Sequence, residues 1–319
     1  MKTAIIIISY NSTQDIIHCI ESVEKFNTAE IKYIIVDNAS TKKNREELEV
    51  YLKSRIPDFQ RYHETVKLKI NLPACSLIVC ENNKGYAQGS NVGLSFAYQD
   101  SNIDHVMILN PDTLFVQDII PSLCGYADRI PDAGIISPLL LKKDGKSIDY
   151  NCARYAVTTS GLFLKYLFYF FDPLRLREYS QNKQYVLFAD SSILQSEKIR
   201  IELPSGSCML MKKAYWEVIE GFDPNTFLFY EEDILFKRIE RIKKQNYLIP
   251  SLKCIHLGEA STKKIKNRYF MLKTDIESSA YYINHYSNFS KAEKIIFKFI
   301  KPYFLFFSMM YNLYAKIKR

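Results

Sequence analysis

The sequence lacks the patterns that mark several common classes of protein. Its seven cysteines are scattered and form no CxxC pair, so neither a structural zinc site nor a disulfide framework is expected. A reducing compartment is the simplest interpretation, and we expect a cytoplasmic protein. The formal net charge is +8, but no arginine-rich run or nucleic-acid-binding motif accompanies it, so we expect no nucleic-acid partner.

Long apolar runs are also missing. The run Ala4–Ile8 is short and is followed by polar Ser9 and Asn11, which indicates a buried strand and not a signal peptide. The apolar and aromatic residues 302–315 fall short of the roughly 20 residues that cross a bilayer. With their flanking lysines they predict either a helix packed on the domain or one lying in a membrane interface. Peripheral contact with the inner leaflet of the cell membrane is therefore one expectation.

Short apolar runs alternate with helical patterns through the first half of the chain. Strands are expected at Ala4–Ile8, Tyr33–Val36, Ser76–Cys80 and Val106–Leu109, and helices at Thr13–Phe26, Glu46–Lys53 and Ala87–Tyr98. This order predicts an α/β fold with a mostly parallel central sheet and helices on both faces. Residues 54–75 are expected to form an excursion between strands. Residues 140–200 are expected to form an irregular insertion or an acceptor-side loop.

Small polar or acidic residues follow each of the four expected strands. Ligands of such sheets bind beyond the carboxyl ends of the strands, so a ligand site is expected there. The residues at these ends are Ser9 and Asn11, Asp37 and Asn38, Asn82 and Asn83, and Asn110 and Asp112.

A glycine-containing segment, Gly85–Gly93, follows the third strand and leads into a helix. Glycines allow a backbone to approach a ligand closely, and helix amino termini attract phosphate. The segment is neither GxGxxG nor a P-loop, because the GK[ST] ending is missing. Gly89 and Gly93 could instead serve only to let the helix pack closely on the sheet, and both interpretations stay open.

Acidic residues after a strand and at a helix start are the candidates for chemistry. Asp112 could ligate Mg²⁺ or Mn²⁺, although Asn-Pro-Asp is also a common turn. A helix is expected to begin near Glu232, with Asp233 opposite the centre of its apolar stripe and Glu232 near the edge. These acids either stabilise the helix dipole or supply a general base. His256 is either structural or a ligand for metal or phosphate.

Taken together, these motifs resemble the family-two glycosyltransferases of the GT-A fold, in particular the rhamnosyltransferase-like branch. The resemblance covers roughly residues 3–262, and the motifs occur in the order of the family. They are Ile7–Asn11, Val36–Ser40, Glu81–Asn91, Leu109–Asp112, Pro204–Ser207, Gly221–Asp223, Glu231–Asp233 and His256–Gly258.

The resemblance implies a GT-A domain over residues 1–265, with a nucleotide-binding half (1–115) and an acceptor and catalytic half (116–265). Beyond about residue 265 the resemblance gives little guidance, and there the apolar and basic pattern itself predicts that residues 266–319 form an amphipathic helical extension able to associate with a membrane. Asp233 would be the general base, with Glu232 as the alternative because the acidic run allows a slipped alignment. Asp112 and His256 would hold a divalent metal, Mn²⁺ or Mg²⁺; the first carboxylate of the usual DxD motif is replaced by Asn110. The donor would be bound by Ser9, Asn11, Asp37, Asn38, Asn83, Gly85, Gly89, Asn91 and Asn110, and the acceptor side would carry Gly206, Phe222 and Asp223.

The implied activity is inverting transfer of a sugar from a dTDP- or UDP-sugar to a hydroxyl group. The acceptor would be a glycan or a lipid-linked oligosaccharide in surface polysaccharide synthesis, and rhamnose is one expected sugar. Two other functions remain open. A sugar-nucleotidyltransferase would usually carry a basic, glycine-rich loop after the first strand, where this chain has Ser9–Thr13. A non-catalytic protein that binds nucleotide sugars would not need the acids at 112 and 233.

Overall fold

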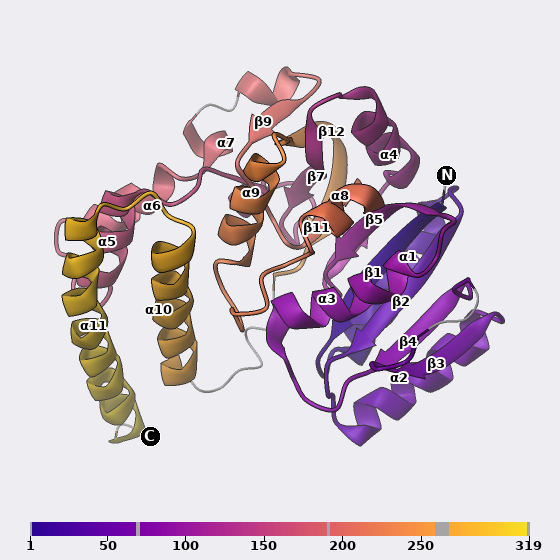
Figure 1. Cartoon of the computed structure of the whole chain (residues 1–319), viewed down its shortest axis with the longest axis horizontal. Coiled ribbons are helices and arrows are strands. Elements are labelled where there is room, and N and C mark those ends of the chain that lie inside the picture. The colour runs from indigo at the N-terminus through magenta and orange to yellow at the C-terminus, as the bar shows by residue number, and fades with distance from the viewer. Residues whose placement is uncertain (1, 68–70, 190–191, 259–267, 318–319) are drawn as a thin grey trace.

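The computed structural model describes residues 2–67, 71–189, 192–258 and 268–317. Its centre is a ten-stranded sheet in the order β3-β4-β2-β1-β5-β11-β7-β12-β6, with β9 paired to β12 (Figure 1). The strands are β1 (Lys2–Ser9), β2 (Ile31–Asp37), β3 (Phe59–His63), β4 (Cys75–Val79), β5 (Ile103–Leu109), β6 (Thr113–Phe115), β7 (Ala133–Leu141), β9 (Ile199–Ile201), β11 (Cys208–Lys212) and β12 (Gln245–His256). A second small sheet pairs β8 (Ala153–Arg154) with β10 (Leu203–Pro204).

The first five strands of this order are parallel, whereas β11 runs antiparallel to β5. The expected strands and helices of the first half are all present. The helices are α1 (Thr13–Phe26), α2 (Lys42–Arg55), α3 (Gly85–Tyr98), α4 (Ile120–Arg129), α5 (Thr159–Leu167), α6 (Leu176–Asn182), α7 (Val186–Ala189), α8 (Lys213–Val218), α9 (Glu231–Arg241), α10 (Arg268–His285) and α11 (Lys291–Ile317).

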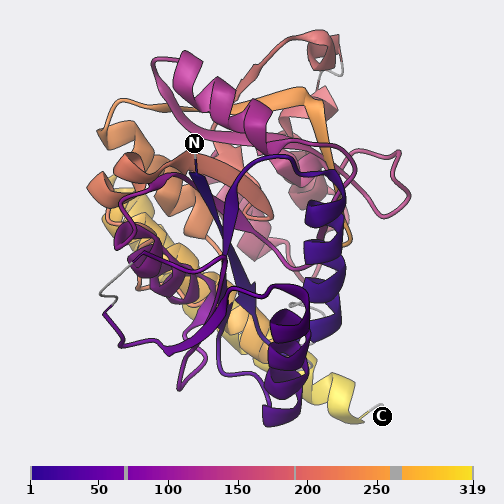
Figure 2. The ribbon, with the colours of Figure 1, turned by 90° about the vertical axis from the view of Figure 1, so that its right-hand side faces the viewer.

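Helices cover both faces of the sheet because the buried strands are apolar on both sides. In β1, Ile5 and Ile7 belong to one core cluster, which also contains buried residues of α1, α2 and α4. Ala4 and Ile6 point to the other face, where buried residues of α3, α8 and α9 complete a second cluster. This alternation follows from the two-residue period of a strand. Figure 2 faces the side of the molecule that the amino-terminal part of the chain forms, with the indigo helices α1 and α2 beside the sheet.

The carboxy-terminal helices form a separate layer. Side chains of α5, α9, α10 and α11 build a third core cluster, and Figure 1 shows α5, α10 and α11 together at one end of the molecule, away from β3 and β4. No helix in the described ranges is both long enough and apolar enough to cross a bilayer. The expected division at residues 265 and 266 lies outside the described residues and stays a prediction.

Two segments differ from the sequence-based expectations. Residues 54–75 contain β3, a parallel edge strand whose sequence, FQRYH, is too polar to show an apolar strand pattern. Residues 140–200 contain α5, α6 and other short elements in place of an irregular insertion. Their aromatic residues pack largely against α10 and α11, a contact that the local sequence does not reveal.

Candidate active site

The polar strand ends converge at one edge of the sheet, as the sequence predicts. In the parallel register Ser9 pairs with Asp37 and Asp37 pairs with Val79, the last residue of β4. On the other side of β1, Ile7 pairs with Leu109, the last residue of β5. The residues that follow these strands therefore emerge side by side.

Asp37 and Asn11 shape the turn that follows β2. The Asp37 carboxylate is fully buried; it accepts a hydrogen bond from the Ser40 backbone N–H at 2.9 Å and forms an ion pair with Arg45. The Asn11 side-chain oxygen accepts a hydrogen bond from the Thr41 N–H at 2.9 Å. These contacts hold the turn against the end of β1, and the predicted contact of both residues with a nucleoside stays a prediction.

Asn38 organises the loop before α3. Its amide nitrogen donates to the Asn83 side-chain oxygen at 3.1 Å and to the Gly85 carbonyl at 2.9 Å, while its oxygen accepts from the Lys84 N–H at 3.0 Å. Gly85 has φ +78°, and a Cβ there would lie 2.1 Å from the Phe227 carbonyl oxygen. Only glycine fits this position, so the loop is fixed in one conformation.

Gly89 and Gly93 allow α3 to pack closely on β1. A Cβ at Gly89 would lie 3.2 Å from Ile8 Cγ2, and one at Gly93 would lie 2.5 Å from Ile6 Cγ2. Both glycines therefore do let the helix pack closely on the sheet. The predicted role of Gly89 in binding the donor stays a prediction.

Three predicted site residues have their side chains engaged within the protein. The Asn91 amide exchanges two hydrogen bonds of 2.8 Å with the Phe222 backbone. Phe222 is 1% exposed, and Asp223 accepts hydrogen bonds from Tyr281 of α10 and from Tyr286, which directly follows that helix. These contacts support the fold around α9 and α10. The predicted approach of an acceptor to Phe222 and Asp223 stays a prediction.

Asp112 and His256 come together although 143 residues separate them in the sequence. His256 Nε2 lies 3.7 Å from Asp112 Oδ2, and its other ring nitrogen, Nδ1, donates to Asp149 Oδ2 at 2.8 Å. Burial would lower the pKa of His256, but the Asp149 hydrogen bond and the Asp112 charge outweigh it, so this pKa lies above its usual value. Asp149 was not among the candidates from sequence.

Asp112 and His256 can supply two of the ligands of the expected divalent ion. The described part of the chain contains no cluster of three or more His, Cys, Asp or Glu residues arranged to hold a metal. A carboxylate and an imidazole would therefore supply two ligands, and phosphate oxygens and water the others, as is common for Mg²⁺ sites. Asp149 would orient His256, because metal-ligating histidines usually donate their second N–H to a carboxylate or carbonyl.

A turn before β11 connects this pair to the start of α9. The Ser207 hydroxyl lies 3.0 Å from His256 Nε2, and the Ser207 carbonyl accepts a hydrogen bond from the Asn110 N–H at 2.9 Å. The neighbouring Gly206 N–H donates to Glu232 Oε1 at 3.0 Å. Three segments distant in sequence thus meet at residues 205–207.

The three acids at the start of α9 differ in exposure. Glu231 and Asp233 are 6% and 4% exposed, and burial raises their pKa values to about 8 and about 6. The Glu232 side chain is 24% exposed, and its Oε2 lies 3.4 Å from Arg154 Nη2. Of the three carboxylates, Glu232 alone combines solvent access with a contact to the 205–207 turn.

The position of Asp233 follows from the surroundings of α9. Leu235 and Ile239 face the cluster against the sheet, as the apolar stripe predicts. The next face, with Ile234, is buried against the third cluster, so Asp233 is also enclosed. Its neighbours include Arg154, which the sequence did not suggest as a functional residue because it lies in the region expected to be irregular.

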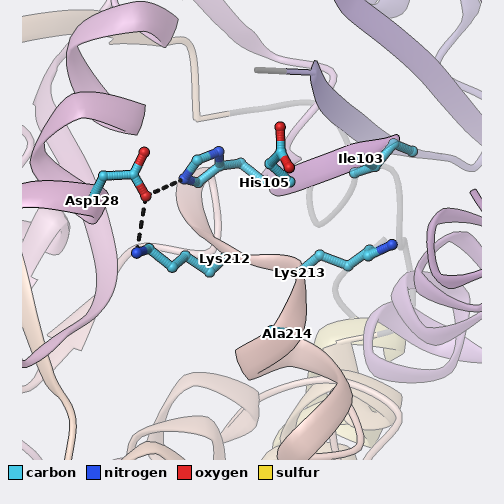
Figure 3. A pocket seen from close by; sticks show the side chains of 7 residues that line it. Ile103, His105, Asp128, Lys212, Lys213 and Ala214 are labelled. Atoms are coloured by element: carbon cyan, nitrogen blue, oxygen red, sulfur yellow. Dashed lines mark hydrogen bonds and ion pairs between the residues drawn. The ribbon is translucent and has the colours of Figure 1, made fainter. Parts of the chain in front are cut away.

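A pocket of about 380 Å³ lies at the opposite end of the sheet (Figure 3). Its lining includes His105 near the start of β5 and Lys212 at the end of β11, and both side chains contact Asp128, at 3.2 and 2.9 Å. Burial lowers the pKa of His105 despite this acidic neighbour. Since Asn110 follows the other end of β5, this pocket is separate from the strand-end site.

Comparisons of sequence agree with these features. The family profile described as "Glycosyl transferase family 2" matches residues 4–217. The N-acetylglucosaminyl-diphospho-decaprenol L-rhamnosyltransferase of Mycobacterium tuberculosis is 26% identical over 159 residues, which cover 50% of this chain and 48% of the relative. The low-salt glycan biosynthesis hexosyltransferase Agl10 of Haloferax volcanii is 22% identical over 229 residues, 72% of this chain and 58% of the relative. The matches thus span about half the length of these relatives.

Comparison of structures agrees as well. The crystal structure of S. aureus TarS 1-349 in complex with UDP-GlcNAc matches with a TM-score of 0.53 at 14% identity, over 96% of this chain and 72% of that one. The structure of TarS 1-349 alone matches with a TM-score of 0.52 at 12% identity, over 92% and 68% of the two chains. The expected GT-A fold with carboxy-terminal helices is confirmed. Since the family profile covers well over half of its residues, the chain belongs to glycosyltransferase family 2.

Proposed function

We propose that this chain is an inverting glycosyltransferase that moves a sugar from a nucleoside-diphosphate donor to a hydroxyl of a glycan or lipid-linked oligosaccharide. One observation carries this proposal. At the carboxyl edge of the parallel strands, the 205–207 turn joins Glu232 to the pair formed by Asp112 and His256. A base and a candidate metal site therefore lie on one continuous rim, as a single displacement at an anomeric carbon requires.

Glu232 is the proposed general base. Its carboxylate is held by the Gly206 N–H and by Arg154, so it is oriented before substrate arrives. It remains partly exposed and can reach an incoming hydroxyl, whereas Asp233 is enclosed. General-base assistance of this kind contributes about 10²–10⁴-fold to rate.

Asp112 and His256 are the proposed ligands of Mn²⁺ or Mg²⁺. When bound, such an ion neutralises charge that develops on the departing diphosphate. Asp149 holds the His256 ring so that its Nε2 lies 3.0 Å from the Ser207 hydroxyl and 3.7 Å from Asp112 Oδ2. Asn110 stands where the first acid of a DxD motif would be, so fewer carboxylates would bind the ion without donor.

The donor would lie along the strand ends. Ser9, Asn11 and Asp37 are proposed to hold the nucleoside, and the loop fixed by Asn38 and Gly85 is proposed to face the diphosphate. The mycobacterial relative is named for transferring L-rhamnose to N-acetylglucosaminyl-diphospho-decaprenol, which makes dTDP-rhamnose the first donor to test. UDP-hexoses follow, since one TarS structure contains UDP-GlcNAc.

Product analysis tests the proposal directly. The purified chain would be incubated with Mn²⁺ and a panel of dTDP- and UDP-sugars, with and without lipid-linked acceptors. We expect release of nucleoside diphosphate and a product of inverted anomeric configuration by NMR. Release of pyrophosphate would instead indicate a nucleotidyltransferase, and donor binding in a thermal-shift assay without turnover on any acceptor would indicate a non-catalytic binding protein.

A further inference from the structure

Helix α11 has two apolar faces, of which the protein covers only one. Phe297, Ile300 and Phe304 pack into the third core cluster and are at most 5% exposed. The opposite face repeats large apolar residues at helical spacing, and they are between 41% and 73% exposed. This uncovered face consists of Ile295, Phe299, Tyr303, Phe306, Met310 and Leu313.

The segment between α5 and α6 extends this apolar surface. The Phe170 ring lies 5.4 Å from the Phe304 ring of the covered face and 6.2 Å from the Phe307 ring, which is 40% exposed. Phe170 therefore packs on α11 where the covered face meets the exposed one. Phe171 and Leu174 in this segment are each 76% exposed, more than any other large apolar side chain described. A soluble monomer rarely exposes so many large apolar side chains in one region.

Positive charge accompanies the uncovered face. At 100° of rotation per residue, Lys294, Lys298 and Lys301 lie on one flank of α11, between its covered and uncovered faces. Glu293 is the single acidic residue of this helix, and its carboxylate already accepts a hydrogen bond from the Ser290 N–H. Among the residues that the structure describes, no acid forms an ion pair with these three lysines.

We propose that α11 and residues 168–175 dock on the headgroup region of an anionic lipid bilayer, with α11 lying parallel to the membrane plane. A helix with exposed aromatic side chains on one side and lysines beside them binds such an interface. A second copy of this chain fits less well, because it would bring further lysines to the surface and few acids to neutralise them. Anionic lipid supplies that charge.

The surface is firmly attached to the catalytic half. Tyr166 of α5 lies 3.2 Å, hydroxyl to hydroxyl, from Tyr230, which directly precedes the acids of α9. On the other side, Tyr281 of α10 and Tyr286 just after it donate hydrogen bonds to Asp223. A docked α11 would thus hold Glu232 at a fixed position relative to the bilayer. This part of the inference rests on the proposed function, because docking of α11 would present a lipid-linked acceptor to Glu232.

Vesicle sedimentation tests the docking without any substrate. The full chain would be mixed with vesicles of pure phosphatidylcholine or of phosphatidylcholine with phosphatidylglycerol. We expect binding to the mixed vesicles that weakens with salt. The double variant Phe299→Ser/Phe306→Ser should lower the partition coefficient by about a hundredfold, because two aromatic side chains no longer leave water. The variant Lys294→Gln/Lys298→Gln/Lys301→Gln should lower binding to mixed vesicles alone.

Matched controls use equally exposed residues elsewhere. Val50 and Val218 are 68% and 65% exposed on α2 and α8, so Val50→Ser/Val218→Ser should bind vesicles like the unmodified chain. As a second readout, Phe299→Trp should shift its fluorescence to the blue on mixed vesicles. Equal sedimentation of all variants, or no binding by the unmodified chain, would overturn the proposal. A dimer in analytical ultracentrifugation that Phe299→Ser/Phe306→Ser dissolves would overturn it in favour of a second copy.

Donor hydrolysis in vesicle-free solution separates this inference from the proposed function. The surface variants leave the strand-end site untouched, so their hydrolysis rate should equal that of the unmodified chain. Loss of vesicle binding with retained hydrolysis then supports docking alone. Absence of hydrolysis by the unmodified chain, with its vesicle binding intact, would contradict the proposed activity and leave the docking surface in place.

Discussion

Replacing Glu232 with glutamine isolates its proposed action as a base. The glutamine oxygen can still accept the Gly206 N–H, which donates to Glu232 Oε1 at 3.0 Å, so the local structure should persist. The substitution removes the ability to take a proton, together with the negative charge that faces Arg154. We expect kcat to fall about 10²–10⁴-fold, equivalent to roughly 3–5 kcal/mol in the barrier, with little change in the donor KM.

Asp233→Asn is the matched comparison, because the two acids are adjacent and differ in exposure. Asp233 is 4% exposed, and we expect this variant to keep kcat within about tenfold of the unmodified enzyme, well short of the loss of a base. Release of nucleoside diphosphate at saturating donor and acceptor gives both rates. Circular dichroism and thermal melting verify that both variants are folded.

Two outcomes would refute the assignment of Glu232 as the base. If Asp233→Asn loses as much activity as Glu232→Gln while melting normally, Asp233 is the base. Exposure in the unliganded protein would then be a poor guide to the catalytic arrangement. Near-unmodified turnover by Glu232→Gln would likewise remove Glu232 from the mechanism.

Four further predictions follow from named contacts. Burial raises the pKa of Asp233 from 3.8 to about 6, so its ionisation costs folding free energy and the protein loses stability as pH rises from about 4 through 6. Urea unfolding should therefore show Asp233→Asn to be more stable at pH 8, by on the order of 3 kcal/mol, and equally stable below pH 4. Chelation with EDTA should abolish transfer, and Asp112→Ala should remove the stimulation by Mn²⁺; equal rates with and without EDTA would contradict the metal proposal. Asp149→Asn should weaken Mn²⁺ binding in the presence of donor about 10–100-fold by calorimetry, because the group that orients His256 loses its negative charge; unchanged affinity would contradict this. Gly85→Ala should lower the free energy of unfolding by more than about 1 kcal/mol, because the new Cβ would lie 2.1 Å from the Phe227 carbonyl oxygen. Unchanged urea unfolding would argue against the loop conformation described.

The central fold could be predicted because its information is local. The apolar runs of β1, β2, β4 and β5 are buried on both faces, so they stand out from the helices between them. Parallel strands place their carboxyl ends at one edge of the sheet, so the strand order by itself predicts that Ser9, Asp37 and Asn110 lie close together. The edge strand β3 escaped prediction because FQRYH is only partly buried and carries little apolar signal.

The contacts within the site could not be predicted from the local sequence. The motifs indicated that Asp112, His256 and the acids of α9 matter, but not which groups touch one another. Asp149 and Arg154 had no sequence signal, because their roles exist only through contacts with His256 and Glu232. The helical period of α9 placed Asp233 away from its apolar stripe and so available for chemistry.

The sequence alone therefore determined the order of strands and helices and the edge of the sheet at which polar groups gather. Tertiary structure decided which carboxylate of α9 remains accessible. The layer formed by α5, α10 and α11 buries the face of α9 that carries Ile234, and the adjacent Asp233 is 4% exposed, whereas Glu232 lies beside the Gly206 turn. The helical period predicts which side of a helix packs on one surface. It cannot predict burial by a second layer, because residues distant in the chain form that layer.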